Sequence, residues 1–349
     1  MRNPSCTIDA AAIFTTFVAV ALWGFMGSRL DRAGAAESPP DKLPAITVPT
    51  MFDTVEADAV VSRLQIFPAD NPWNADISSW PVHPDSAAIV GSIGADKPLR
   101  GNTDMGYVLV PPDQKRIDVK LTAYPDESDK GPYPVPDNCP IEGWPANFRR
   151  DAATKKISID DVQRDKLGQG GDRHAIVVDP ANHRLYEFYQ LKKTDAGWQA
   201  AQASIFDLAS NKLRPAGWTS TDAAGLPIFP AIVRYDELKR GEINHALRVT
   251  VKRSRKEYVA PATHYASRLT DKNLPRMGER LRLKADYDIS GFSPPVKAIL
   301  KALQKHGMFV ADNGLEWALS IAPDERTAAM HDELRKVKGS AFEVVTAPK

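Results

Sequence analysis

The chain has 349 residues, and its 45 Lys and Arg residues nearly balance its 44 Asp and Glu residues, which gives a formal net charge of +1 at pH 7. This balance excludes a general electrostatic attraction to nucleic acid, and the length is sufficient to bury a hydrophobic core. Because the sequence has only two cysteines, Cys6 and Cys139, it also excludes a disulfide-rich scaffold.

The first segment of the chain predicts export from the cytoplasm. Residues 10–28 form an uncharged, mostly apolar run after Arg2, and the small residues 33–35 follow it. A signal peptide has this composition and order, and so does a short membrane anchor. We expect residues 1–35 to be either a cleaved signal peptide or an anchor that holds the protein to a membrane through residues 10–28. Both alternatives place the remaining chain outside the cytoplasm, as a secreted or periplasmic protein.

Residues 36–65 are expected to form a proline-rich tether that ends in a short helix at residues 57–64. A single β-rich globular domain is expected over residues 66–349. It begins with residues 67–74, in which Asp, Asn and Pro favour tight turns. The elements expected next are a helical turn at residues 86–93 and a long proline-rich loop at residues 122–147.

Strands are predicted in the second half of the chain. Residues 174–179 form a continuous apolar run, typical of a strand that is buried on both faces. Residues 245–251 and 280–285 alternate between apolar and polar side chains, which predicts strands with one face in the core and one in solvent. Two further strands are expected at residues 184–191 and 198–208.

The C-terminal part of the chain predicts helices and further strands. An apolar stripe at helical spacing lies between Ser293 and Gly307, which suit the two ends of a helix. Asn313-Gly314 favours a tight hairpin turn between strands at residues 308–311 and 316–321. The last expected elements are a helix at residues 328–337 and a strand at residues 341–346.

Strands without regularly alternating helices favour antiparallel pairing over a parallel sheet. The sequence therefore predicts a mainly β, α+β fold: one antiparallel β-sandwich or barrel-like domain with a few helices, two of them near the C-terminus. The sequence lacks the G-x-S-x-G, H-E-x-x-H, paired C-x-x-C and phosphate-binding loop motifs. We therefore expect no cofactor and no nucleic acid partner.

Glu187 is the first candidate catalytic residue. It lies within a predicted strand among apolar and aromatic side chains, including Leu185 and Tyr189. Burial raises the pKa of a carboxyl group, and a general acid that works near neutral pH needs a raised pKa. The alternative is a structural glutamate in an ion pair with Arg173 or Arg248.

Asp172, Arg173 and His174 form a second group of candidates, where a glycine-rich turn enters a strand. Functional side chains are common at such positions, because loops carry function on a rigid scaffold. Asp172 is a candidate catalytic carboxylate, and Arg173 and His174 are candidates for substrate binding. His174 could instead be a base that Asp172 orients, or a metal ligand. In the alternative interpretation, Asp172 caps the strand and His174 is structural.

Two further histidines extend the set of candidates. His174, His245 and His264 could together bind a metal ion if adjacent strands carry them, although no local H-x-H spacing supports such a site. Without a metal, His245 is a candidate catalytic residue, and His264 and Tyr265 are candidates for substrate binding. Three separate structural histidines are the simpler alternative.

Residues 218–227 predict a polar loop that faces a ligand. The loop begins with Trp218, a candidate substrate-binding residue, and contains Asp222, a candidate acid or base. Aromatic rings beside carboxylates suit the faces of sugars, because stacking and polar contacts are both available. The alternative is a well-packed turn with Trp218 as its plug. A basic stripe at residues 280–284 could meet an acidic polysaccharide, although such stripes are more often solvated sheet faces.

Five segments together resemble a broad family of secreted, chiefly bacterial proteins that are mostly uncharacterised. They are FPADNPWN at residues 67–74, GDRH at 171–174, WTSTDAAGLP at 218–227, HYAS at 264–267 and ADNG at 311–314. The resemblance covers nearly all of the chain beyond Gln65. It implies one extracytoplasmic domain, and it implies neither a particular reaction nor catalytic residues.

These patterns together favour an exported carbohydrate-active enzyme, most simply a glycoside hydrolase that uses a pair of carboxyl groups. The candidate catalytic residues are Glu187, Asp172, Asp222 and His245, and the expected partner is a polysaccharide or another glycan. Two alternatives stay open: a non-catalytic envelope or glycan-binding protein, and a metal-dependent enzyme that uses histidines.

Overall fold

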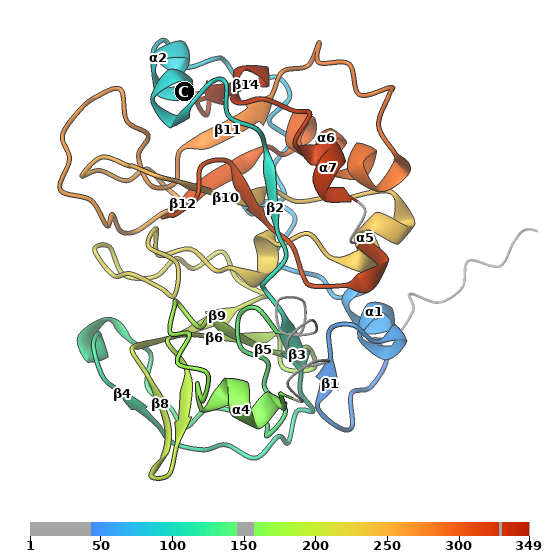
Figure 1. Ribbon diagram of the computed structural model, residues 1–349, viewed down its shortest axis with the longest axis vertical. Coiled ribbons are helices and arrows are strands. Elements are labelled where there is room, and N and C mark those ends of the chain that lie inside the picture. The colour runs from blue at the N-terminus through green and yellow to red at the C-terminus, as the bar shows by residue number, and fades with distance from the viewer. Residues whose placement is uncertain (1–42, 145–156, 328–329, 349) are drawn as a thin grey trace, which may run out of the picture. The chain divides into compact units, whose positions relative to one another are not determined.

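A computed structural model describes residues 43–144, 157–327 and 330–348 of the chain (Figure 1). The predicted signal peptide or anchor lies outside the described residues, as does the end of the long loop at residues 122–147. The described residues belong to one compact unit that begins at Lys42. In its described part, the segment expected to be a tether is packed into this unit, since Phe52 and Val60 are buried in the hydrophobic core.

The first sheet has five strands in the order β1-β3-β5-β6-β9. They are β1 (Thr50–Met51), β3 (Tyr107–Leu109), β5 (Ala175–Asp179), β6 (Arg184–Tyr189) and β9 (Gln202–Asp207). β3 and β5 run parallel, and the other neighbouring strands run antiparallel. Along β5, Ile176 and Val178 face one core, whereas Ala175 and Val177 face another. This alternation confirms the predicted strand that is buried on both faces.

The second sheet has six strands in the order β14-β11-β12-β10-β13-β2. They are β2 (Arg100–Asn102), β10 (Leu247–Val251), β11 (Arg280–Leu283), β12 (Met308–Asn313), β13 (Ala318–Ser320) and β14 (Phe342–Val345). The predicted hairpin of residues 308–321 is wrong, because β10 lies between β12 and β13 and pairs with both. β12 continues through Asn313, where the turn was expected, because Asp312 and Asn313 pair with Thr250 and Val251.

A small third sheet packs against the first. Its order is β4-β8-β7, with β4 (Val119–Leu121), β7 (Lys192–Thr194) and β8 (Gly197–Ala200). The core between the two sheets includes Val177 and Phe188 of the first and Trp198 of the third. The single strand predicted for residues 198–208 is thus divided at Ala201 into β8 and β9, which belong to different sheets.

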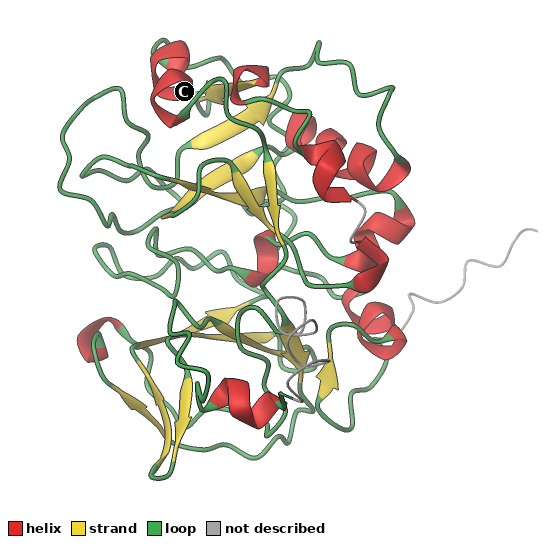
Figure 2. Cartoon of the chain, in the orientation of Figure 1, coloured by secondary structure: helices red, strands yellow, loops and turns green. Residues whose placement is uncertain are grey.

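Helices cover one side of the second sheet. Figure 2 shows α5, α6 and α7 together on that side. The described helices are α1 (Val55–Val61), α2 (Ser86–Ile93), α4 (Ile159–Gln163), α5 (Tyr235–Arg240), α6 (Pro294–Lys305) and α7 (Met330–Leu334); short 3₁₀ turns are η1 (Pro125–Glu127), η2 (Phe229–Ala231), η3 (Glu325–Thr327) and η4 (Gly339–Ala341). α6 buries the predicted apolar stripe, which includes Val296, Ile299 and Leu303, and this burial holds the helix on the sheet.

The fold class predicted from the sequence is confirmed, since the protein is mainly β with a few helices, two of them near the C-terminus. The sheets contain both parallel and antiparallel pairs, and the described strands form no closed barrel. In the basic stripe at residues 280–284, Lys284 is exposed but the two arginines are buried. Arg280 and Arg282 are 4% and 6% exposed, because backbone carbonyl groups and Glu343 accept their hydrogen bonds inside the protein.

Candidate functional site

A polar cavity of about 290 Å³ is lined by residues of both larger sheets. Asp172 lies just before β5 and Tyr189 at the end of β6, whereas Asp312 and Asn313 end β12. The other lining residues come from loops and are Tyr124, Thr219, Ser220, Thr221, Ala223, His264 and Ala266. We call this cavity the polar pocket. It brings together side chains that are far apart in the sequence.

The loop of residues 218–227 forms one wall of the polar pocket and is bound to both sheets. The N–H of Ala224 donates to the carbonyl of Ala311 in β12, at 2.9 Å. Just after the loop, the N–H of Ile228 donates to Glu187 Oε1 in β6, also at 2.9 Å. The loop is therefore fixed in position, as a wall that binds a ligand must be.

Asp222 lies beneath this loop and is 0% exposed. Its carboxylate forms a bidentate pair with Arg248 of β10, with Nε–Oδ2 at 2.9 Å and Nη2–Oδ1 at 2.5 Å. Arg248 also donates to the hydroxyl of Ser320 in β13. The pair therefore joins the loop to the second sheet, and Asp222 does not line the polar pocket.

Glu187 is also 0% exposed, and no arginine of the described residues pairs with it. Its carboxyl oxygens accept hydrogen bonds from the N–H of Ile228, the N–H of Phe229 and the hydroxyl of Thr221, the last at 3.2 Å. Arg173 and Arg248, the partners in the alternative interpretation, bind other groups. The predicted ion pair of Glu187 with either arginine is therefore wrong. Burial raises the pKa of Glu187 to about 7, against the opposing effect of the two N–H groups. Thr221 connects this buried carboxyl group to the wall of the polar pocket.

Of the residues that the structure describes, Asp312 and Asp172 are the two whose carboxyl groups line the polar pocket. Asp312 is part-buried, whereas Asp172 is exposed. Burial, and next the nearby Asp222, hold the pKa of Asp312 well above its ordinary value, although Arg248 opposes this. The pocket thus presents two carboxyl groups in different surroundings, which is the arrangement that separates an acid from a base.

Tyr189 and His264 supply further polar groups to the pocket. Burial, and next the Asp172 carboxylate, raise the pKa of the Tyr189 phenol, which therefore keeps its proton. His264 Nδ1 lies 2.8 Å from the carbonyl oxygen of Ala223. Because a carbonyl oxygen only accepts, Nδ1 carries a proton and donates it in this hydrogen bond.

Behind the polar pocket lies a second acidic group, formed by Asp104 and Glu142 beside His174. Burial, and next the neighbouring Glu142, raise the pKa of Asp104 to about 7. Burial also raises the pKa of Glu142, which accepts a hydrogen bond from the N–H of His174 at 3.2 Å. The His174 ring packs 5.7 Å from the ring of Tyr189, and burial lowers its pKa, so it is held neutral.

Besides His174, three of the predicted substrate-binding residues do not line the polar pocket. Arg173 donates to the carbonyl groups of Val162, Gln163 and Leu191, and so holds the chain around α4. Trp218 stacks with the Arg214 guanidinium, 5.6 Å from the ring centre. Tyr265 stacks on His264, with ring centres 5.8 Å apart and planes 6° apart. Tyr265 is thus next to the pocket, one ring away from its wall.

The three histidines of the proposed metal site are not brought together. His264 lines the polar pocket and His174 lies behind it, but His245 belongs to another region, where its Nε2 is 2.8 Å from Glu237 Oε1. Within the residues that the structure describes, no group of three or more His, Cys, Asp or Glu side chains could hold a metal ion.

Asp312 was not among the candidate residues predicted from the sequence, because the Asn-Gly pair after it is typical of a simple turn. The signal that could have found it is its position at the end of an apolar strand, the same kind of position that singled out Asp172. Tyr124 and Tyr189 were missed because nothing local distinguishes them from core aromatics.

Comparison with known proteins provides no relative. No protein-family model, no curated protein and no solved structure matches this chain. Among the described residues, no helix is both long and apolar enough to cross a membrane.

Proposed function

We propose that the protein is an exported glycoside hydrolase that cleaves a neutral glycan in the polar pocket. The observation that carries the proposal is the presence of two carboxyl groups, Asp312 and Asp172, in one polar cavity but in different surroundings. Most glycoside hydrolases use such a pair on either side of the scissile bond.

Asp312 is the proposed general acid. Because its pKa is well above the ordinary value, its carboxyl group keeps a proton at a pH where most aspartates have lost theirs. It would donate this proton to the glycosidic oxygen as the bond to the leaving sugar breaks. Asp172, which is exposed, would act as the second carboxylate, either as a nucleophile or as a base that activates water.

Charge favours a neutral substrate. No Lys or Arg side chain in the described part of the chain lines the polar pocket, and Asp104 and Glu142 lie behind it. An acidic polysaccharide would find no cation among these lining residues and would face the exposed Asp172 carboxylate, which costs binding free energy. Tyr124 is 44% exposed and, with Tyr189, offers ring faces suited to sugars.

Glu187 and Asp222 act indirectly in this proposal. Both side chains are 0% exposed, so a substrate in the polar pocket cannot contact either of them. Glu187 holds Thr221, and Asp222 holds the same loop onto Arg248. They are positioning residues for the loop that forms one wall of the polar pocket. The proposed location, outside the cytoplasm, rests on the apolar run of residues 10–28 in the sequence.

The test is an assay for new reducing ends on a panel of neutral and acidic polysaccharides, with and without a chelator. We expect release from a neutral glycan that the chelator does not affect. Asp312→Asn and Asp172→Asn should each lower the rate at least about 100-fold. Asp96→Asn, which changes an exposed carboxylate that does not line the polar pocket, is the matched control and should leave the rate unchanged.

A glycan-binding protein without activity is the second candidate, because aromatic rings form a row beside the polar pocket. Tyr258 stacks on Tyr265 with ring centres 6.4 Å apart, and Tyr265 stacks on His264. Binding of a glycan without release of reducing ends would favour this candidate. Release that the chelator abolishes would contradict the mechanism with two carboxyl groups.

A further inference from the structure

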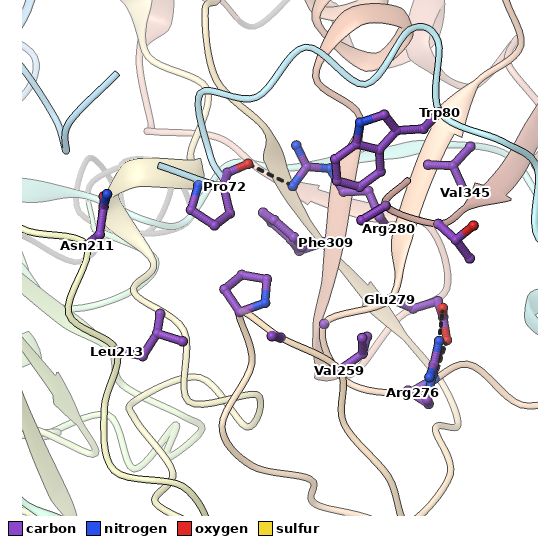
Figure 3. A pocket seen from close by; sticks show the side chains of 15 residues that line it. Pro72, Trp80, Asn211, Leu213, Val259, Arg276, Glu279, Arg280, Phe309 and Val345 are labelled. Carbon is purple, nitrogen blue, oxygen red and sulfur yellow. Dashed lines mark hydrogen bonds and ion pairs between the residues drawn. The ribbon is translucent and has the colours of Figure 1, made fainter. Parts of the chain in front are cut away.

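A second cavity, of about 440 Å³, shares no lining residue with the polar pocket. Its walls are mainly apolar, and Figure 3 shows Pro72, Leu213, Val259, Phe309 and Val345 around it. We call this cavity the apolar pocket. Its size suits a small organic molecule.

Arg280 of β11 lies at one end of the apolar pocket. In Figure 3 its guanidinium group lies near Pro72 and Trp80, and it stacks on Phe309 with 3.9 Å between the guanidinium carbon and the ring centre. Nε donates to the carbonyl of His306 at 2.8 Å, and Nη1 donates to the carbonyl of Pro72 at 3.1 Å. Nη2 has no hydrogen-bond partner among the described residues.

Arg280 is also a buried cation, and no carboxylate of the described residues forms an ion pair with it. The other buried arginines of the described part of the chain each form an ion pair with a carboxylate: Arg173, Arg214, Arg234, Arg248 and Arg282. Arg280 is 4% exposed and forms no such pair, and burial lowers its pKa to about 9. Its neighbour Glu279 lines the same pocket, but Arg276 binds that carboxylate at 2.8 Å.

An unpaired buried charge costs free energy, and an anion brought to it by a ligand would offset that cost. The apolar walls would bury an alkyl or aryl group at the same time. The anion matched here carries a single charge, because Arg276, the other cation of the lining, is already neutralised by Glu279. A carboxylate fits this requirement better than a phosphate, which carries up to two charges and needs more donors.

We propose that the apolar pocket binds a small carboxylate with an apolar body, whose carboxylate forms charge-assisted hydrogen bonds with the Arg280 guanidinium group. This is a second ligand site, and it does not depend on the activity proposed for the polar pocket. Charge-assisted hydrogen bonds of this kind are about twice as strong as neutral ones.

Calorimetric titration of the full-length protein with octanoate, well below the concentration at which it forms micelles, tests the proposal. Octanol, which has the same chain without the charge, is the matched probe. We expect octanoate to bind and to raise the melting temperature, and octanol to bind at least about tenfold more weakly. Arg280→Met, which removes the cation but keeps an apolar side chain, should weaken octanoate binding by at least about tenfold.

Two other variants keep the test decisive. Lys212→Met removes an exposed cation that does not line the apolar pocket, and octanoate binding should be unchanged. Leu213→Trp fills the pocket from its rim without touching Arg280, so octanoate binding should fall even if Arg280→Met fails to fold. Equal binding of octanoate and octanol, no binding of octanoate to the wild type, or undiminished binding to Leu213→Trp would each overturn the proposal.

Discussion

Asp312 gives the polar pocket its dependence on pH. Its pKa is raised, first by burial and then by Asp222, so its carboxyl group stays protonated above the range of an ordinary aspartate. An acid catalyst works only while it holds its proton. Activity should therefore persist through mildly acidic pH and fall as pH rises through the pKa of Asp312. Measuring reducing ends across pH checks this, and a rate that still increases at alkaline pH would contradict the role of Asp312.

The pair of Asp222 and Arg248 predicts a strong effect on stability. Removing one partner of a buried ion pair leaves the other charge uncompensated, which costs about 3–5 kcal/mol. Asp222→Asn should lower the free energy of unfolding by this amount, as measured by urea denaturation. Asp222→Leu combined with Arg248→Met removes both charges and should recover much of the loss. If the double variant loses as much stability as Asp222→Leu and Arg248→Met lose separately and summed, the two side chains are not energetically coupled.

The sequence indicated part of this residue set. Asp172 and His264 were selected from their positions beside strands and loops, and both line the polar pocket. The carboxyl group of Glu187 was expected to be buried, and it is. Its partners could not be predicted, because the N–H groups of Ile228 and Phe229 reach it only through the folded loop.

At the scale of elements, the loop of residues 218–227 depends on one glycine. Gly225 has φ +74°, and a Cβ atom there would lie 2.0 Å from Thr263 Oγ1 and 2.8 Å from the carbonyl oxygen of Trp218. Alanine must therefore move both the loop and its neighbour, and the wall of the polar pocket would move with them. Gly225 thus satisfies two requirements, a left-handed backbone and a close approach.

Gly225→Ala should lower both the melting temperature and the activity. Gly241→Ala is the matched control, because Gly241 has φ +79° but nothing within 4 Å of the added Cβ atom. In the control, the free energy of unfolding should fall only by what the left-handed conformation costs an alanine, about 1 kcal/mol. Thermal unfolding and the reducing-end assay on both variants separate the effect of the left-handed conformation from the effect of the close approach to Thr263. Equal losses in the two variants would show that the close approach to Thr263 does not matter.

Local patterns predicted the elements well where the neighbours along the chain decide the structure. The helices α2 and α6 and the strand β5 lie where the sequence placed them, within a few residues. Prediction failed where distant segments decide. β12 was ended too early because only its pairing with β10 extends it through Asn313. β11 was expected to be half-buried, but Arg280 and Arg282 are enclosed by carbonyl groups that no local pattern reveals.

At the scale of the whole described unit, the polar pocket exists only because two sheets meet. Asp172 lies just before β5 of the first sheet and Asp312 lies in β12 of the second, and the loop of residues 218–227 is bound to both sheets. No local sequence pattern predicts that the two sheets lie together, since the two aspartates are separated by most of the second half of the chain. This arrangement also gathers carboxyl groups: Asp104, Glu142 and Glu187 are all held near the same region with raised pKa values.

These carboxyl groups predict how stability depends on pH. The pKa of Asp104 and that of Glu187 are each raised to about 7 in the folded protein, from ordinary values of 3.8 and 4.5. Between the ordinary and the raised values, the folded state binds more protons than the unfolded state. Its stability is therefore greatest below the ordinary values and is lost as pH rises through about 7. The loss for Glu187 alone is about 3 kcal/mol.

Urea denaturation at several pH values between about 4 and 8 measures this slope. Carboxyl groups with lowered pKa values, such as Asp161 and Asp207, act in the opposite direction, but they lie near the surface, where such effects are small. Combining Asp104→Asn with Glu187→Gln should flatten the fall in stability, because an amide cannot lose a proton, whereas Asp161→Asn should leave the fall in place. A wild-type stability that rises steadily to pH 8 would mean that the folded protein supplies these buried carboxylates with a positive partner. Such a partner would also supply the charge that an acidic polysaccharide needs, so the same measurement bears on the choice of a neutral substrate.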